Sequence, residues 1–165
     1  MKILVAVGSK YGGTREIAEA IAATLRERGF ETDLADACDV SSVRFYDVVI
    51  VGSAVYGGLW RRDASDLIHA HQVMLRSRAV YLFSAGITSV TKPDQPIDEA
   101  EQLATLVEAR EHKRFNGRLD VEKLNIGEKA LIKAINPPVG DFRDFEEVRA
   151  WASDIGVRLE DQAFA

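Results

Sequence analysis

The chain has 165 residues, of which 47% are hydrophobic and 28% charged, a composition typical of a folded protein and not of a disordered or fibrous one. Its formal charge of −5 repels nucleic-acid phosphates and so disfavours non-specific binding to DNA or RNA. Cys38 is the single cysteine, which rules out an internal disulfide. We expect one domain over residues 1–165, without a linker, in the cytoplasm.

Apolar runs alternate with helical patterns in the first half of the chain. Lys2 to Val7 is rich in β-formers, too short to span a bilayer, and predicts a buried strand. Apolar residues then repeat at helical spacing, which predicts a helix over about residues 14–28 that ends at Gly29. A weak strand over residues 31–35 and a strong buried strand over residues 47–52 follow. The first half therefore has the order β-α-β-β.

The second half continues this alternation. The patterns predict a helix, a strand, a helix, a short strand and an amphipathic stretch at residues 62–76, 79–83, 97–111, 115–119 and 123–136. Asp144 with Glu147 is typical of a helix N-terminus, and the apolar stripe that follows predicts a closing helix. Such alternation predicts a three-layer doubly wound α/β fold with a five-stranded parallel sheet of order 2-1-3-4-5.

In a doubly wound sheet, ligands bind beyond the carboxyl ends of the strands, near the point where the strand order reverses. Residues 8–14 form such a loop, and its adjacent glycines allow several N–H groups to converge at a helix N-terminus. The hydroxyls of Ser9 and Thr14 and the ammonium of Lys10 suit a dianionic phosphate monoester. The sequence therefore predicts a phosphate site, although a plain tight turn with an N-cap is the simpler alternative.

Three rival motifs of this topology do not match. A Walker loop needs Lys immediately before its final Ser or Thr, whereas Gly13 precedes Thr14 here. A dinucleotide fingerprint needs a second glycine where this chain has Lys10. A receiver domain needs Asp at the end of its third strand, where Gly52 and Ser53 stand. These departures disfavour an NTPase, a dinucleotide site of that kind and a receiver.

The motif Ser9-Lys10-Tyr11-Gly12-Gly13-Thr14 resembles the flavodoxin phosphate loop, and residues 14–18 resemble its continuation in the menaquinone-dependent protoporphyrinogen oxidase branch. Residues 52–60 are similar to the second flavin loop of these proteins, and residues 140–145 to the stretch that leads into their last helix. Ordinary flavodoxins carry Thr and Asn where this chain has Tyr11 and Gly13, which favours the oxidase-like branch. The resemblance implies a flavodoxin-like fold with FMN as cofactor.

The resemblance also implies which residues contact FMN. Three groups are expected at the phosphate, along the ring and at its pyrimidine side: Ser9, Lys10, Tyr11, Gly12, Gly13 and Thr14; Ser53, Ala54, Val55, Tyr56 and Gly57; and Ser84, Ala85 and Gly86. Tyr56 or Trp60 is expected to stack on the ring or, alternatively, only to cover the strand end. Likewise, residues 84–86 are alternatively a plain strand exit.

No side chain is predicted as a nucleophile, a general base or a metal ligand, and the three histidines are expected to have surface or packing roles. Two functions stay open: an FMN-dependent oxidoreductase of the protoporphyrinogen or quinone type, and a non-catalytic module with weak or lost flavin binding. We expect electrons to pass through a quinone or a redox partner protein. Residues 123–136 either meet a membrane surface peripherally or cover the core, and the oxidase family has a longer, more basic segment there.

Overall fold

The computed structural model describes residues 1–9, 12–86, 98–119, 140–141 and 143–163. Within these ranges the strands are β1 (Lys2–Gly8), β2 (Glu31–Asp36), β3 (Val48–Tyr56), β4 (Leu59–Trp60), β5 (Ala79–Gly86), β6 (Glu111–Asn116), β7 (Arg118–Leu119) and β8 (Gly140–Asp141). The helices are α1 (Gly13–Glu27), α2 (Arg62–Ala70), α3 (Gln72–Leu75), α4 (Glu99–Val107) and α6 (Phe145–Ala163), with a 3-10 turn at Ala37–Asp39. The amphipathic stretch 123–136 lies outside the described residues.

Parallel strands form the centre of the sheet, in the order β2-β1-β3-β5-β6. Counted among themselves, these five strands follow the predicted order 2-1-3-4-5. The sequence did not predict β4, a two-residue strand that pairs antiparallel with β3 and is the sixth strand of the sheet. Strands β7 and β8 pair with each other in a separate antiparallel ribbon. The predicted doubly wound fold is confirmed, with one added antiparallel strand.

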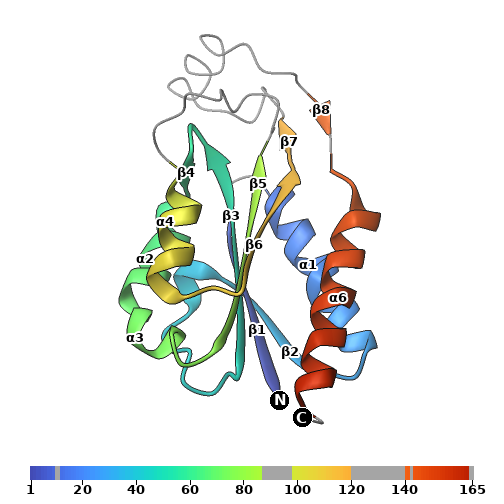
Figure 1. The fold of residues 1–165 in the computed structure, drawn as a ribbon. Coiled ribbons are helices and arrows are strands. Elements are labelled where there is room, and N and C mark those ends of the chain that lie inside the picture. Colours follow the sequence, from blue (N-terminus) through green and yellow to red (C-terminus); the bar gives the residue numbers. More distant parts are fainter. Residues whose placement is uncertain (10–11, 87–97, 120–139, 142, 164–165) are drawn as a thin grey trace.

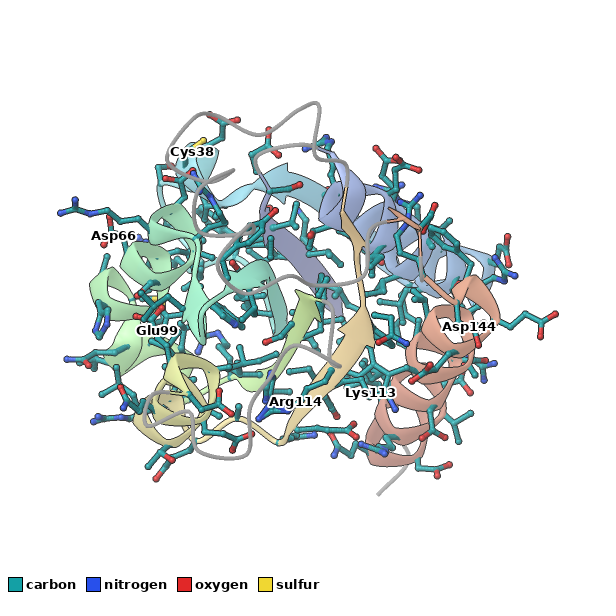
Figure 2. The ribbon with its side chains drawn as sticks, turned by 90° about the horizontal axis from the view of Figure 1, so that it is seen from above. Cys38, Asp66, Glu99, Lys113, Arg114 and Asp144 are labelled. Atoms are coloured by element: carbon teal, nitrogen blue, oxygen red, sulfur yellow. The ribbon has the colours of Figure 1, made fainter. Side chains whose placement is uncertain are left out.

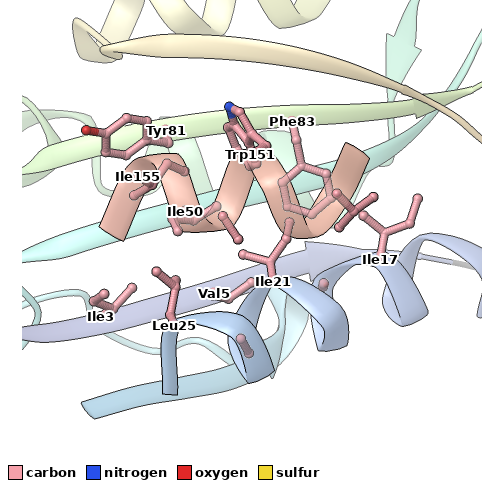
Figure 3. Close-up of a cluster of buried hydrophobic side chains, with 14 of the residues drawn as sticks. Ile3, Val5, Ile17, Ile21, Leu25, Ile50, Tyr81, Phe83, Trp151 and Ile155 are labelled. Carbon is pink, nitrogen blue, oxygen red and sulfur yellow. The ribbon is translucent and has the colours of Figure 1, made fainter. Parts of the chain in front are cut away.

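Helices cover both faces of the sheet, as Figure 1 shows: α1 and α6 lie on one face, and α2, α3 and α4 on the other. Successive side chains of a strand point to opposite faces, so β1 contributes Ile3 and Val5 to the first core and Leu4 to the second. In the first core, side chains from α1 pack on the same face of the sheet as Trp151 of α6 (Figure 3). The second core lies under α2 and α4 and includes Trp60. The strands whose ends carry the candidate site are therefore packed against a hydrophobic core on each face of the sheet.

Two predicted loops begin later than expected, because β3 continues to Tyr56 and β5 to Gly86. The small residues at these strand ends were interpreted as exit turns, but Ser53 and Ser84 are both buried. Burial on both faces favours extended backbone even for residues with low strand propensity. The predicted ring and pyrimidine loops are therefore largely strand ends.

Two predicted helices are shorter than expected. The pattern over residues 62–76 is broken at His71, which separates α2 from α3. The helix predicted over residues 97–111 ends at Val107, because the next residue, Glu108, adopts a left-handed φ of 54°. The chain then enters β6 at Glu111, so the strand predicted to begin at Phe115 starts earlier. A left-handed C-terminal residue other than Gly or Asn leaves little signal in the sequence.

The closing helix begins as predicted. One carboxylate oxygen of Asp144 accepts the backbone N–H groups of Glu146 and Glu147, at 3.1 and 3.2 Å. The indole of Trp151 then meets the rings of Tyr81, Phe83 and Phe115 edge-on, with centroids 5.5 to 6.5 Å apart. Among the helices that the structure describes, none has both the length and the apolar composition to cross a bilayer.

Candidate functional site

Three strand ends lie in register at the carboxyl edge of the sheet. Gly8 of β1 pairs with Ser53 of β3, and Ser53 pairs with Ser84 of β5. In parallel strands, residues in register lie side by side, and neighbouring strands are about 4.8 Å apart. The loop after β1 therefore lies beside the ends of β3 and β5, which carry the predicted ring contacts.

The loop after β1 turns directly into a helix. Gly12 has a left-handed φ of 86°, which an L side chain rarely adopts, and α1 begins at the next residue. The N–H group of Gly12 donates to the hydroxyl oxygen of Ser9 at 3.2 Å, and Thr14 is buried in the first turn of α1. The first N–H groups of any α-helix lack partners within the helix and carry its positive dipole end. This geometry fits a phosphate monoester; Lys10 and Tyr11 lie outside the described residues.

Arg143 anchors this loop, and the sequence reasoning did not identify it. Its side chain is only 5% exposed and donates to the carbonyl oxygen of Gly13 at 3.2 Å. It also pairs with Asp141 at 2.7 Å and with Glu16 at 3.2 Å. The hydrogen bonds from Arg143 to Asp141, and the charges of Asp141 and Glu16, hold the pKa of Arg143 above its ordinary value. The only signal in the sequence was the resemblance of residues 140–145 to a family segment.

A pocket of about 300 Å³ opens beside the phosphate loop, on the side of β2. Its lining consists of Val7, Ser9, Gly12, Arg15, Asp36, Cys38 and Asp63. Arg15 forms an ion pair with Asp36, so its charge is already partly neutralised. The carboxylates of Asp36 and Asp63 disfavour an anion beside them.

The predicted ring loop is a tight hairpin between β3 and β4. Gly57 and Gly58 have φ values of 59° and 80°, as in the type I′ turns that match the twist of paired strands. The antiparallel pair places Val55 opposite Trp60. Ser53 lies beneath the hairpin, where its hydroxyl accepts the N–H of Arg61 at 2.7 Å. The hairpin therefore has a defined shape, with the half-buried Tyr56 paired with Leu59 directly before the glycine turn.

Trp60 does not lie on the outer face of this hairpin. Its side chain belongs to the core under α2 and α4, and the residue is 5% exposed. The indole Nε1 donates to the hydroxyl oxygen of Ser84 at 2.8 Å, and the backbone N–H donates to Glu99 at 2.8 Å. The alternative that Trp60 covers the strand end is therefore correct, and the prediction that it stacks on a ligand is wrong for this structure.

His112, predicted to have a surface or packing role, lies in a polar network that joins the buried Ser84 to the exposed Glu101. Its Nε2 lies 2.7 Å from the hydroxyl oxygen of Ser84, and its Nδ1 lies 2.9 Å from a carboxylate oxygen of Glu101. The imidazole is 3% exposed. The hydrogen bond from His112 holds the pKa of Glu101 below its ordinary value, and the charge of Arg114 acts in the same direction. Ala85 and Gly86 complete the end of β5, with Ala85 buried against the other face.

Figure 2 looks down on this edge of the sheet and shows Arg114 on the α4 side of β6 and Lys113 on the α6 side. Arg114 pairs with Asp98 and Glu101 of the α4 N-terminus, whereas Lys113 pairs with Glu147 at 3.3 Å. Among the described residues there is no cluster of His, Cys, Asp and Glu that is arranged to hold a metal ion. Within these ranges the site offers a helix terminus, a glycine hairpin and buried hydroxyls, which are groups that can bind an organic ligand.

A family model described as the flavodoxin domain matches residues 4–145. The chain belongs to the flavodoxin-domain family. Membership implies an FMN cofactor. The phosphate loop described above fits the phosphate of that cofactor, because α1 offers its N-terminus at a left-handed glycine.

Solved flavodoxins share the fold. The flavodoxin of Streptococcus pneumoniae TIGR4 is 16% identical, with a TM-score of 0.65 over 96% of this chain and 99% of that one. Flavodoxin 2 of Bacillus cereus is 26% identical, with a TM-score of 0.58 over 82% of this chain and 96% of that one. Among curated relatives, the quinone protoporphyrinogen IX dehydrogenase of Escherichia coli K12 is 26% identical over 106 residues, or 63% of this chain. The match spans 58% of the length of that relative.

Proposed function

We propose that this flavodoxin-domain protein is an FMN-dependent oxidoreductase that oxidises a protoporphyrinogen-like substrate and passes the electrons to a quinone or a redox partner protein. The similarity to protoporphyrinogen IX dehydrogenase supports the substrate class. The observation that carries the proposal is the register of Gly8, Ser53 and Ser84, which aligns a phosphate-binding helix terminus with a glycine hairpin. FMN supplies the chemistry of hydride and single-electron transfer when it is bound.

In this proposal the protein holds and orients the cofactor. Ser9, Gly12, Gly13 and Thr14 would hold the phosphate together with Lys10 and Tyr11. Residues 53–57 would border the ring, and the left-handed Gly57 leaves the backbone open to close approach. Backbone groups of residues 84–86 would border the pyrimidine side, because the hydroxyl of Ser84 is already bonded to Trp60 and His112. The family resemblance and the topology suggest these assignments, and the shape and polarity of each segment support them.

A comparison of FMN with riboflavin tests the phosphate site. The two ligands share a ring and differ by the phosphate, so we expect the apoprotein to bind FMN at least a hundredfold more tightly, as charge-assisted hydrogen bonds at a helix terminus predict. Quenching of flavin fluorescence during titration measures both dissociation constants. Equal affinities would remove the phosphate site from the proposal, and a failure to bind either ligand would favour a non-catalytic module.

An anaerobic turnover assay tests the substrate class. The FMN-loaded protein is mixed with protoporphyrinogen IX and with menadione as a soluble quinone, and porphyrin fluorescence is followed. We expect porphyrin to appear at a rate proportional to protein concentration, because the bound flavin would accept electrons from protoporphyrinogen IX and pass them to menadione. The apoprotein is the control. If the flavin is bleached by a flavodoxin reductase but not by protoporphyrinogen, the protein is an electron carrier instead.

A further inference from the structure

The donor and the acceptor of each hydrogen bond in the network around His112 can be assigned. The indole Nε1 of Trp60 only donates, and the carboxylate of Glu101 only accepts. The carboxylate therefore places a hydrogen on Nδ1 of His112 and leaves Nε2 of the neutral ring as an acceptor. The hydroxyl of Ser84 accepts from Trp60 and donates its own hydrogen to Nε2. The hydrogen bonds therefore all point in one direction, from Trp60 in the hairpin through Ser84 and His112 to Glu101 of α4. The direction is set by the indole at one end and by the carboxylate at the other.

Protonation of His112 reverses one of these bonds. Nε2 then carries a hydrogen and donates to Ser84, whose oxygen already accepts from Trp60. The hydroxyl hydrogen of Ser84 loses its acceptor at a position that is 6% exposed. A buried donor without a partner is unfavourable, so the bond between Ser84 and Trp60 must weaken or the strand ends must shift.

In this network His112 is the imidazole, and the charged groups around it are carboxylates and a guanidinium. Imidazole is the side chain that ordinarily titrates between pH 5 and 8. Glu101 of α4 and Asp98 just before that helix pair with Arg114 of β6, and the hydrogen bond from His112 holds the pKa of Glu101 below its ordinary value. Glu99 accepts the backbone N–H of Trp60 and faces Ser65 of α2. Lys113 points to the opposite face of the sheet, toward α6.

We propose that His112 is a pH-responsive positioning residue, which acts through Ser84 on Trp60 and so on the hairpin between β3 and β4. The order of Ser84, His112 and Glu101 resembles that of a nucleophile, a base and an acid. Ser84 is nevertheless buried and already accepts the indole hydrogen, so the geometry assigns its hydroxyl to the relay and not to attack on a substrate. The effect of the relay on FMN rests on the proposed function, whereas its effect on Trp60 does not.

The test uses the ligand-free full chain, labelled with nitrogen-15. The chain has two tryptophans, so a Trp151→Phe variant assigns the two indole signals. Trp151 donates to Glu111 at 2.9 Å and has no histidine partner there, which makes it an internal reference. Between pH 5 and 8 we expect the Trp60 indole signal to titrate in one step, with the same midpoint as the ring protons of His112. The Trp151 signal should show no such step.

Variants separate the relay from general structural change. Ser84→Ala keeps His112 titrating but should abolish the step at Trp60, and His112→Gln should abolish it as well. The exposed His69→Gln is the matched control and should keep the step. The proposal is overturned if the Trp60 signal stays constant while His112 titrates, or if its step persists in Ser84→Ala. Labelling of Ser84 by a fluorophosphonate would also overturn it, because that would reveal a free nucleophile.

A second measurement extends the test to the cofactor. We expect the FMN dissociation constant of the parent protein to change by roughly fivefold or more between pH 5 and 8, a size typical of coupled sites. His112→Gln should flatten this pH profile. If the protein binds no flavin, the indole titration still decides the relay; if FMN binds with the same pH profile in both proteins, the coupling to the hairpin is wrong.

Discussion

Replacing Gly52 with alanine is expected to lower the free energy of unfolding by about 3 kcal/mol, at the upper end of what an added methyl costs in a packed core. A Cβ at this position would lie 1.9 Å from Cζ of Phe83 and 2.2 Å from both of its Cε atoms. The Phe83 ring has no room to retreat, because Phe115 and Trp151 pack against it with centroids 6.1 Å away. The change should be measured by urea denaturation monitored by circular dichroism.

The double variant Gly52→Ala with Phe83→Leu isolates the cause. Removing the ring creates the space that the methyl needs, so the double variant should be more stable than the sum of the two single changes predicts. Strict additivity, or a loss below about 0.5 kcal/mol for Gly52→Ala alone, would contradict the steric explanation. Gly52 precedes Ser53, which pairs with Gly8 at the end of β1. The same variant therefore also tests whether the strand ends beneath the candidate site tolerate a displacement.

Gly13→Asp is expected to weaken FMN binding by about a thousandfold, which corresponds to about 4 kcal/mol for two like charges some 4 Å apart near a protein surface. Gly13 is the first residue of α1, at the helix end proposed to hold the phosphate. A carboxylate in the first turn of a helix favours the fold itself through the helix dipole. The variant should therefore stay folded while it loses the cofactor. Flavin fluorescence titration measures the first effect, and thermal denaturation of the apoprotein measures the second.

Gly13→Asn is the matched control, since its side chain has nearly the same shape without the charge. We expect it to bind FMN much more tightly than Gly13→Asp and more weakly than the parent. Similar affinities for the two variants would mean that crowding, and not charge, is what the loop rejects. Raising the salt concentration should narrow the difference between them, because exposed charges are screened.

Patterns within single elements could be predicted from the sequence. The helical spacing of Ile17, Ile21 and Leu25 identified α1, and the capping carboxylate of Asp144 identified the start of α6. The loop between Gly8 and Gly13 was identified because glycines and a helix start occur together there. Each of these signals lies within one or two turns of chain, where propensity and periodicity operate.

Features that depend on long-range contacts could not be predicted. The ends of β3 and β5 are strands because neighbouring strands and helices bury their small residues on both faces. His112 gains its partners from β5 and α4, 28 and 11 residues away along the chain, so its position beside Lys113 and Arg114 suggested only a surface or packing role. Arg143 reaches Gly13 across 130 residues. In each case the deciding contact joins segments that no local pattern connects.

The span between Gly13 and Arg143 also sets an order of assembly. Chains are synthesised from the N-terminus, so the phosphate loop leaves the ribosome long before Arg143, 130 residues later. Until that arginine arrives, its hydrogen bond to the carbonyl of Gly13 and its ion pair with Glu16 cannot form. A nascent chain that carries the complete glycine loop is thus still without its anchor. The loop that the proposed function assigns to the FMN phosphate is therefore one of the last parts of the domain to become complete, and retention of the cofactor would report a finished fold.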